Sequence, residues 1–503
     1  MLPECSVHPA FRFRKKQGIL LPAPGFSAFL LAREKMMVEK LNWNSARQLA
    51  KGFAKRQFSP VDVAKACLVQ MSKHESAINA MALIDEKTTL AMAKASELRW
   101  LKGKSFGPLD GVPVLIKDLL LTKGWPTRRG SKTIDPTGPW EHDAPSVARL
   151  REAGSVFMGL TTTPEFGWKG VTDSPRTGIT RNPWNTDLTP GGSSGGSAAA
   201  LAAGYACLAI GTDGGGSIRI PAGFTGTFGL KPSFGRVPAW PLSPFGTVAH
   251  IGPMARSVND AALMLNEMAK PDNRDWFSLP YVAVDYSKLN KSLKGLRVAF
   301  SPDLGYVNVD PEVAKLVAKA VGTLKQLGAK VTHIDPGFAD PAPCFRTLWW
   351  SAARALLAGL PPDKLALLEP ALADVVEQAA ATTVRDIFAA YKDRGLLGTH
   401  MRLFMEKYDV LITPTLPITA FKAGQLQPDD PDAHGKWVNW TPFTYPFNLT
   451  QQPAASVPCG FSKSGLPVGL HIIGKMFDDA TVMRVCAGFE AATAYHLQRP
   501  KNY

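Results

Sequence analysis

The residues best suited to chemistry lie between Thr189 and Pro221, where nine glycines and four serines occur among thirty-three residues. Glycine weakens helices and strands from within, so such a density indicates a special use of the backbone. Gly214, Gly215 and Gly216 follow a short apolar segment, CLAIGTD, that predicts a strand, and they directly precede Ser217. Consecutive N–H groups in such a run can converge on one point and hold an anion. Beside a serine nucleophile, they predict an oxyanion hole for acyl transfer.

Other uses of a glycine-rich run fit this segment poorly. The chain has neither the GxxxxGK[ST] phosphate loop nor the GxGxxG dinucleotide motif. Gly192–Gly196 matches the GxSxG elbow of α/β-hydrolases, with Ser194 as its serine. That elbow needs a preceding strand, but TRNPWNTDLTP is rich in turn formers, and none of the nine histidines has a persuasive context. The sequence therefore disfavours both the phosphate loop and the elbow.

Lys117 is the unusual candidate for the base that a serine nucleophile needs. It interrupts the otherwise apolar predicted strand within GVPVLIKDLL. Burial lowers the pKa of a lysine because desolvation disfavours the ammonium form, and a neutral amine can accept a proton. A salt bridge with Asp118 or Asp213, or a side chain that reaches solvent, accounts for the lysine equally well on spacing alone.

The segments around these residues alternate between helical and strand patterns, which predicts an α/β fold with a largely covered sheet. A helical pattern after Asn44 breaks at Phe58, and Ser59 followed by Pro60 predicts the start of the next helix. Between about 338 and 405 the pattern is helical, and this segment fits a cap over the site and a part of the helical shell equally well. The other expected elements are a helix over 86–101, the helix SVARLREAG closed by Gly154, the strand SVFMGLTT, the helix VAKLVAKAVGTLKQLGA, and the strands GLRVAFSPDL, KVTHI and YDVLITPTLP.

Composition excludes several classes of protein. At 503 residues and 45% hydrophobic, the chain can bury a large core, but its apolar runs are shorter than the roughly 18 residues of a membrane span. The net charge of +15 is scattered, with only short clusters such as RFRKK, which favours a soluble basic protein over nucleic-acid binding. Six widely spaced cysteines without a CxxC pair argue against a disulfide framework or zinc site and favour a reducing compartment. We expect a cytoplasmic protein without metal or cofactor.

The N-terminal residues have only a weak likeness to a targeting signal. FRFRKKQG followed by ILLPAPGFSAFLLA has a basic and then an apolar part, but Pro22 and Pro24 interrupt it and no small-x-small cleavage site follows. We interpret residues 1–37 as a loose tail or a mis-assigned start, and residues 38–503 as a single domain.

The segment GGSSGGSAAALAAGYACLAIGTDGGGSIRIPAGFTGTFGLKPSFGRVP resembles the signature of the amidase signature family, which includes fatty acid amide hydrolase, malonamidase and the A subunit of the tRNA-dependent amidotransferase. The resemblance covers roughly residues 44–490 and is weakest across 270–400. It implies a central mixed β-sheet covered on both faces by helices. It extends to GPLDGVPVLIKDLL, LTTTPEFGWKGVTDSPRTGITRNPWN, HIGPMARSVNDAALML, YDVLITPTLP and NLTQQPAASVPCGFSKSGLPVGLHIIG.

The resemblance implies a Ser-cisSer-Lys triad. Ser217 is then the nucleophile, Ser193 the proton relay after a cis peptide at Gly192–Ser193, and Lys117 the base. The implied reaction attacks an amide carbon with Ser217 and returns the proton through Ser193 to the leaving amine, after which water hydrolyses the acyl-enzyme. The implied oxyanion donors are the N–H groups of Gly214, Gly215, Gly216 and Ser217.

Further positions follow from the same resemblance. Thr212, Asp213 and Arg219 match positions that support the glycine loop, and a purely structural role for them is also open. Gly214 replaces a frequently bulkier residue, which implies a looser oxyanion hole or a wider acyl pocket, and Gln451 replaces a frequent glycine. Three aromatic residues are expected to contact an apolar or aromatic part of the substrate, or equally to lie in the core: Phe166, Trp168 and Phe224.

The sequence therefore predicts an amidase that acts alone on a small-molecule amide. The alternative is the glutaminase A subunit of a tRNA-dependent amidotransferase, which works in a complex. The complete set of Ser217, Ser193 and Lys117 disfavours a third class, a non-catalytic binding protein. The physiological substrate and the assembly state, a homodimer included, are left open.

Overall fold

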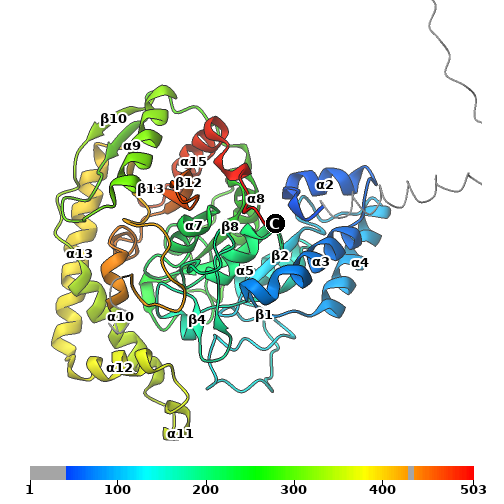
Figure 1. Cartoon of the computed structure of the whole chain (residues 1–503), viewed down its shortest axis with the longest axis horizontal. Coiled ribbons are helices and arrows are strands. Elements are labelled where there is room, and N and C mark those ends of the chain that lie inside the picture. Colours follow the sequence, from blue (N-terminus) through cyan, green and yellow to red (C-terminus); the bar gives the residue numbers. More distant parts are fainter. Residues whose placement is uncertain (1–40, 429–435) are drawn as a thin grey trace, which may run out of the picture.

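The computed structural model describes residues 41–428 and 436–503, so the prediction of a loose tail over residues 1–37 lies outside the described residues. The described chain folds around one large β-sheet with helices on its outside (Figure 1), which confirms the predicted α/β fold with a central mixed sheet. The strands are β1 (Met81–Leu83), β2 (Pro113–Lys117), β3 (Val156–Thr161), β4 (Asp173–Ser174), β5 (Gly178–Ile179), β6 (Leu208–Asp213), β7 (Phe228–Lys231), β8 (His250–Ala255), β9 (Arg297–Phe300), β10 (Lys330–His333), β11 (Val410–Pro414), β12 (Ala454–Phe461) and β13 (Pro467–Gly474).

Some of the helices begin at side-chain caps that the sequence offers. The predicted break at Phe58 is confirmed, because Ser59 caps the following helix by accepting a hydrogen bond from Asp62 N at 3.2 Å. Gly154 follows the predicted helix at SVARLREAG with φ +78°, which suits a residue that ends a helix. The α-helices are α2 (Ala46–Ala54), α3 (Pro60–Ile78), α4 (Glu86–Leu101), α5 (Pro145–Glu152), α6 (Gly195–Ala202), α7 (Arg219–Thr225), α8 (Val258–Met268), α9 (Pro311–Gln326), α10 (Ala342–Leu357), α11 (Pro362–Leu365), α12 (Pro370–Gln378), α13 (Val384–Glu406), α14 (Pro446–Leu449) and α15 (Asp479–Thr493).

The large sheet has the strand order β1-β3-β2-β6-β8-β7-β12-β13-β11-β9-β10. Strand β2 lies between β3 and β6 and runs parallel to both, and β9 is parallel to β10 and β11. The other neighbours in this sheet are antiparallel. Because β2 and β6 are adjacent and parallel, their carboxyl ends meet at one edge of the sheet.

The sheet separates two apolar cores. On β9, Val298 and Phe300 belong to the core shared with α8, α9 and α15, whereas Ala299 between them belongs to the core shared with α10 and α13. On β13, Ile472 belongs to the first of these cores and the next residue, Ile473, belongs to the second. Since successive strand residues point to opposite faces, this part of the sheet is covered on both faces, as expected.

The segment predicted to be helical between about 338 and 405 contains α10, α11, α12 and α13. Figure 1 shows α10, α12 and α13 on the side of the molecule opposite α2, α3 and α4. Helices α10 and α13 pack against each other. The segment is therefore a helical layer of its own beside the sheet.

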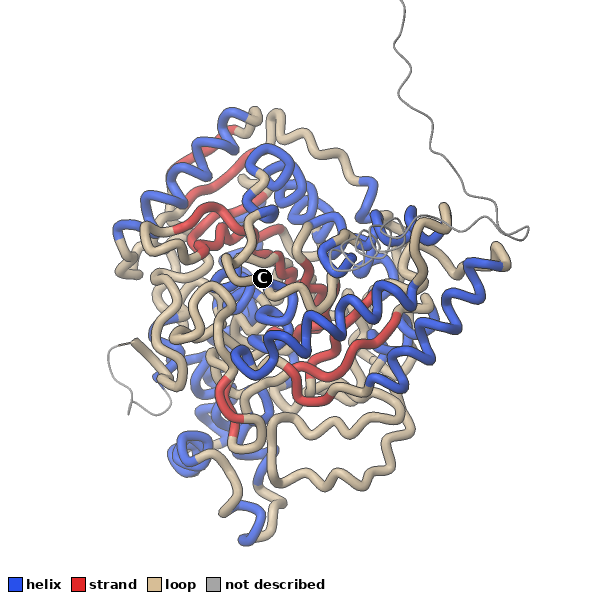
Figure 2. Tube along the Cα trace, turned by 45° about the vertical axis from the view of Figure 1, so that its right-hand side comes forward, coloured by secondary structure: helices blue, strands red, loops and turns tan. Residues whose placement is uncertain are grey.

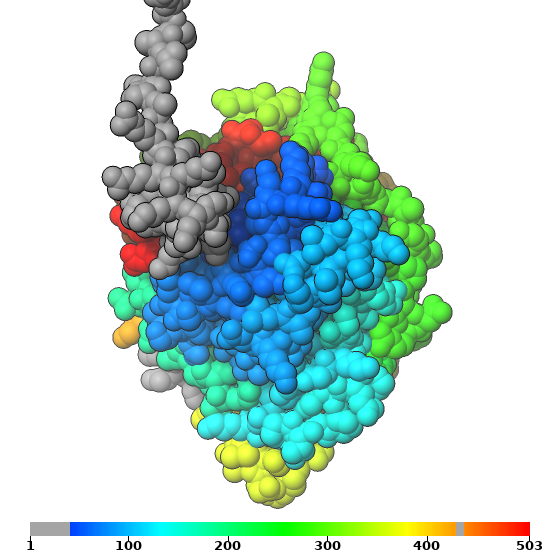
Figure 3. All heavy atoms as spheres, turned by 90° about the vertical axis from the view of Figure 1, so that its right-hand side faces the viewer, coloured from blue at the N-terminus to red at the C-terminus, as the bar shows by residue number. Residues whose placement is uncertain are grey.

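Figure 2 shows the strands enclosed by helices and loops, and in Figure 3 the blue N-terminal helices lie beside the red C-terminal residues. The two ends of the described chain thus share one face of the molecule. None of the helices in the described ranges combines the length and the apolar character that crossing a bilayer requires.

Candidate active site

Lys117 is the last residue of β2, and the neighbouring strand β6 ends at Asp213. The sequence placed the lysine in the middle of a strand, but the chain turns directly after it. The N–H groups of Leu119 and Leu120 donate to the Lys117 carbonyl at 2.7 and 3.1 Å, which closes this turn. The lysine therefore lies at the carboxyl edge of the sheet, where α/β proteins commonly bind ligands.

The Lys117 side chain is buried among hydroxyl groups. Its Nζ lies 2.7 Å from Ser193 Oγ, 2.9 Å from Ser194 Oγ and 2.8 Å from Thr212 Oγ1. Burial lowers the pKa of Lys117 well below its ordinary value, and the nearby Asp213 carboxylate opposes this shift. A neutral amine in this position can accept a proton from a serine hydroxyl.

The salt bridge that would equally explain a buried lysine is not formed among the described residues. Asp118 instead lies 3.6 Å from Arg176 and accepts a hydrogen bond from Arg128 N at 2.8 Å. Asp213 is paired with Arg219 at 2.9 Å. The lysine does not reach solvent either, because its exposed fraction is 0%. The site thus holds a lysine whose partners are hydroxyls.

Ser193 and Ser194 lie in the loop that leads into α6. The Gly192–Ser193 peptide bond is cis, at the position that the family resemblance implies. A Cβ at Gly192 would lie 2.4 Å from the carbonyl oxygen of Val171, so this close backbone contact needs glycine. Strand β5 ends at Ile179, and loop and turn structure fills the chain from there to Ser194. The hydrolase elbow is therefore absent from this fully described stretch.

Asp213 and Arg219 form a buried ion pair beneath the loop from Gly214 to Ser217. Arg219 Nε and Nη2 each donate to the Asp213 carboxylate at 2.9 Å. Burial opposes ionisation of Asp213, but Arg219 and the surrounding hydrogen bonds hold the pKa of its carboxyl below its ordinary value. The same carboxylate accepts hydrogen bonds from Gly216 N at 2.8 Å and Ile218 N at 3.1 Å. The ion pair therefore fixes the backbone of the loop.

These bonds correct the predicted oxyanion hole. The Gly216 N–H donates to Asp213, so it is not available to a ligand, although the family resemblance implied that it is one of four donors. Its φ of +128° lies in the region that favours glycine, which explains why glycine occurs there. The N–H groups of Gly214, Gly215 and Ser217 donate to no protein acceptor within the described ranges. Three N–H groups rather than four are therefore left without a protein acceptor in the described chain, and two of their residues, Gly214 and Ser217, line the adjoining cavity.

A cavity of about 130 Å³ adjoins these groups. Ser193 and Ser217 both line it, together with Thr212 and Gly214. The predicted nucleophile, its predicted relay and two further residues, Thr212 and Gly214, thus share one space. The other walls are mainly apolar and are formed by Leu119, Leu120, Leu121, Phe166, Trp240, Leu242, Phe245, Ile251, Trp349 and Leu356.

Two of the three predicted substrate contacts do not line this cavity. Trp168 is fully buried, and its Nε1 donates to Glu369 Oε2 at 2.9 Å. Phe224 stacks on Trp440 with ring centroids 5.8 Å apart. Both belong to the apolar core that also includes α10, so they pack rather than face a ligand. Phe166 is the one of the three that reaches the cavity.

The two departures from the family pattern have structural explanations. The Trp349 ring fills the space next to Gly214, so this glycine does not widen the pocket as the sequence suggested. Gln451 adopts φ +63°, a conformation that glycine adopts easily. Its Nε2 donates to Thr247 O at 2.9 Å and so fastens the loop that carries Phe245.

Sequence reasoning missed several residues of the cavity wall. Trp349 and Leu356 come from α10, far along the chain from the glycine-rich run, and no motif marks them. Phe245 stacks on Trp349 with ring centroids 3.8 Å apart. Arg129 also lines the cavity, and the arginine pair in TRRGS, shortly after Lys117, was a signal that could have found it.

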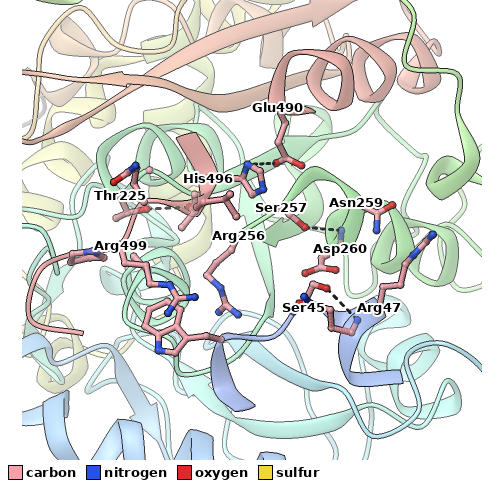
Figure 4. A pocket seen from close by; sticks show the side chains of 18 of the residues that line it. Ser45, Arg47, Thr225, Arg256, Ser257, Asn259, Asp260, Glu490, His496 and Arg499 are labelled. Carbon is pink, nitrogen blue, oxygen red and sulfur yellow. Dashed lines mark hydrogen bonds and ion pairs between the residues drawn. The ribbon is translucent and has the colours of Figure 1, made fainter. Parts of the chain in front are cut away.

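A second cavity, of about 390 Å³, lies where the starts of α2 and α8 meet the C-terminal segment (Figure 4). Arg256 and Arg499 line it, and both guanidinium groups lie over the Trp43 ring, 5.1 and 4.2 Å from its centroid. None of the predicted site residues lines this second cavity. The candidate active site is therefore the smaller cavity.

The side chains of the described residues also show what the site can hold. No group of three or more His, Cys, Asp or Glu residues in 41–428 and 436–503 is arranged to bind a metal ion. The cavity instead offers two serine hydroxyls and backbone N–H groups, and the buried Lys117 amine lies 2.7 Å from one of these hydroxyls, Ser193 Oγ. These groups suit proton transfer and stabilisation of an oxyanion.

Comparisons with known proteins agree with this chemistry. The Amidase family model matches residues 62–483. The chain is 37% identical to an acylamidase of Rhodococcus erythropolis, over 93% of this chain and 99% of that protein. It is 36% identical to the A subunit of the glutamyl-tRNA(Gln) amidotransferase of Carboxydothermus hydrogenoformans, over 92% of this chain and 100% of that protein.

A solved structure gives the same result. The crystal structure of a bacterial aryl acylamidase of the amidase signature family matches with a TM-score of 0.84 and 31% identity, over 90% of this chain and 98% of that one. The protein therefore belongs to the amidase signature family and is an amide-hydrolysing enzyme.

Proposed function

We propose that this enzyme hydrolyses a carboxylic acid amide through an acyl-enzyme on Ser217. Neutral Lys117 takes the proton of Ser193, Ser193 takes that of Ser217, and Ser217 Oγ bonds to the amide carbon. The C–N bond then breaks, and the proton returns through Ser193 to the leaving amine or ammonia. Water attacks the resulting ester, which releases the acid and restores Ser217.

The observation that carries this proposal is the environment of Lys117. A buried amine with hydroxyl partners at 2.7–2.9 Å, and with no carboxylate paired to it among the described residues, suits a general base better than a structural cation. Ser193 is one of these partners, and it lines the same cavity as Ser217. This arrangement supports a proton path from Ser217 to Lys117.

Stabilisation of the tetrahedral intermediate is assigned to the glycine loop. The N–H groups of Gly214, Gly215 and Ser217 have no protein acceptor within the described chain, so they are available to an oxyanion. Thr212 contacts Lys117, and the pair of Asp213 and Arg219 fixes the loop. We assign these three residues to positioning rather than to chemistry.

We also propose that the helical segment between about 338 and 405 covers the site. Trp349 and Leu356, both on α10, line the cavity from this segment. Its attachment to the rest of the protein is polar as well as apolar, because Glu369 N donates to Glu165 Oε2 at 2.7 Å. The segment would then shape the pocket and exclude water from the acyl-enzyme.

A second candidate is the glutaminase component of a tRNA-dependent amidotransferase, because relatives of that name match almost the whole chain. Free glutamine carries an ammonium group that needs an anionic or polar partner when buried. Asp213 is the only carboxylate among the described residues that line the cavity, and Arg219 already pairs with it. This favours an amidase that works without a partner protein on an amide other than glutamine.

The five described cysteines are free thiols, which supports the cytoplasm as the location of the enzyme.

The test is turnover of a panel of anilides, aliphatic amides and glutamine by the isolated protein. We expect hydrolysis of anilides or aliphatic amides that is lost in Ser217→Ala. Glutaminase activity that requires both charged tRNA and a partner protein would establish the second candidate instead.

A further inference from the structure

Arg129 introduces a positive charge into the wall of an otherwise mainly apolar cavity. It lines the same space as Ser193 and Ser217. The other ionisable side chains on this wall are Asp213 and His250. Burial lowers the pKa of His250 well below its ordinary value, so the imidazole is neutral, and Asp213 is paired with Arg219. Arg129 therefore carries the unbalanced charge of the site.

The guanidinium of Arg129 has no hydrogen-bond acceptor and no ion-pair partner among the described residues. Asp118 attracts Arg129 electrostatically but forms no salt bridge or hydrogen bond with its side chain. Its carboxylate is instead bound to the N–H groups of Arg128 and Gly130, at 2.8 and 3.1 Å, and lies 3.6 Å from Arg176. Arginine stays protonated in proteins, and a partly buried cation without a partner is unfavourable. An anionic group supplied by a ligand would remove this cost.

The backbone of Arg129 is held in place for such a task. The residue adopts φ +54°, a conformation that is uncommon outside glycine, asparagine and aspartate. Its carbonyl accepts a hydrogen bond from Phe166 N at 2.8 Å, and the flanking N–H groups of Arg128 and Gly130 bind Asp118. Strained positions of this kind are concentrated at ligand-binding sites. The loop thus fixes the base of the arginine side chain next to Phe166, another residue of the cavity wall.

We infer that Arg129 binds a carboxylate of the substrate, so that the enzyme prefers amides in which an apolar chain or ring links the scissile amide to a carboxylate. A guanidinium forms two parallel hydrogen bonds with a carboxylate, which gives both affinity and orientation. The apolar wall from Leu119 to Leu121, with Phe166 and Ile251, would hold the linking part. A substrate with an additional ammonium group is disfavoured, because no unpaired carboxylate lines the described cavity. This inference rests on the proposed amidase function.

The experiment uses two matched pairs of substrates on the full-length protein. Glutaryl and pentanoyl para-nitroanilide differ by a carboxylate in place of a methyl group on the acyl side. Para-acetamidobenzoate and para-methylacetanilide differ in the same way on the amine side. The measured quantity is the ratio of kcat/KM within each pair, for the wild type, Arg129→Met, Arg129→Lys and the control Arg128→Met.

We expect the wild type to favour the carboxylate in one of the two pairs, which also shows on which side of the amide Arg129 lies. Arg129→Met should lower that ratio by about 10-fold or more, because the charged partner is lost. Arg129→Lys should retain part of the preference, and Arg128→Met should retain it fully, because Arg128 does not line the cavity. Melting temperatures show whether each variant is folded.

Two results would overturn the inference. One is a wild type that hydrolyses the neutral substrates at least as well as the charged ones in both pairs. The other is a preference that persists in Arg129→Met. A protein that hydrolyses none of the four amides would instead contradict the proposed amidase function. A readout that does not depend on turnover is the melting temperature of Ser217→Ala with the preferred pair of amides. The carboxylate member should raise this temperature more than its neutral partner does, and adding Arg129→Met to Ser217→Ala should abolish the difference.

Discussion

The indole ring of Trp349 lies directly against Gly214. A Cβ added at Gly214 would be 2.5 Å from Cζ3 of the ring and 2.7 Å from Cη2. The ring has little freedom to move away, because its Nε1 donates to Trp168 O at 2.9 Å and its face stacks on Phe245. A residue on α10 and the first glycine of the proposed oxyanion hole are therefore fitted to each other.

This contact predicts that Gly214→Ala is harmful and that the harm depends on Trp349. The added methyl group forces the indole or the loop to shift, at a cost of about 1–3 kcal/mol. We expect a lower melting temperature and a lower kcat/KM, because the same loop holds the proposed oxyanion donors. Trp349→Leu removes the clash, so the double variant should lose less than the sum of the two single losses. Additive losses would show that the two residues act independently.

The second prediction concerns Ser217, the proposed nucleophile. Ser217→Ala should lose essentially all turnover and keep its melting temperature, because it removes only a hydroxyl from the cavity wall. A fluorophosphonate should label Ser217 in the wild type and leave this variant unlabelled, as mass spectrometry of peptides can determine. Ser194→Ala is the control, since Ser194 is a direct neighbour of Lys117 but does not line the cavity. Labelling of Ser194 would contradict the assignment.

The third prediction is a pH dependence governed by Lys117. Burial lowers its pKa, and only the neutral amine can accept a proton, so kcat/KM should fall as pH decreases through the lowered pKa. Above that pKa the amine is neutral and this loss is absent. Lys117→Arg places a permanently charged group in the pocket and should lower the rate by about 10²–10⁴-fold across the accessible pH range.

The control is to measure kcat/KM against pH for the wild type and for Lys117→Arg, and to compare the decrease on the acid side of the two profiles. If Lys117→Arg keeps both its rate and this decrease, another group is the base. If the variant is poorly folded, Lys117→Met tests the same point, because it removes the amine without adding charge.

The sequence predicts the parts of this site that lie within short local motifs, but it does not predict contacts that depend on the path of the folded chain. Ser217 and Lys117 lie within short motifs whose residue types indicate a reaction, whereas the role of Ser193 follows from the family resemblance. The alternation of strands and helices indicates the sheet that positions these motifs. Gly216 shows what the sequence does not reveal, because its N–H could donate either to a ligand or to Asp213. Only the three-dimensional path of the loop decides between them.

The walls of the pocket were harder to predict for a different reason. Trp168 and Phe224 are close in sequence to catalytic motifs, yet their side chains face the core. Trp349 is distant in sequence and reaches the cavity because α10 packs across it. Aromatic residues serve cores and pockets equally well, so their type alone does not reveal which way they point.

The last prediction concerns the buried pair of Asp213 and Arg219. Arg219 also donates to Asn448 Oδ1 at 2.6 Å and to Thr444 O at 3.0 Å, so it joins the glycine loop to the segment around α14. Arg219→Met leaves a buried carboxylate without its main partner, which should cost about 3–5 kcal/mol of stability at neutral pH. Arg297→Met breaks the exposed pair with Asp409 and should cost at most about 1 kcal/mol.

The sign of the pH dependence distinguishes this effect from lost packing. In the wild type the pKa of Asp213 is held below its ordinary value, so its stabilising contribution is present above an unfolded pKa of about 3.9 and is lost as pH falls below it. Without Arg219, burial is the main influence on Asp213 and raises the pKa of its carboxyl group. Protonation of this carboxyl then removes the cost of a buried, unpaired charge and stabilises the variant. The gap in urea midpoint between wild type and Arg219→Met should therefore narrow as pH falls from about 7.5 to 5. A gap that stays constant over this range would mean that Arg219 acts through packing and neutral hydrogen bonds alone.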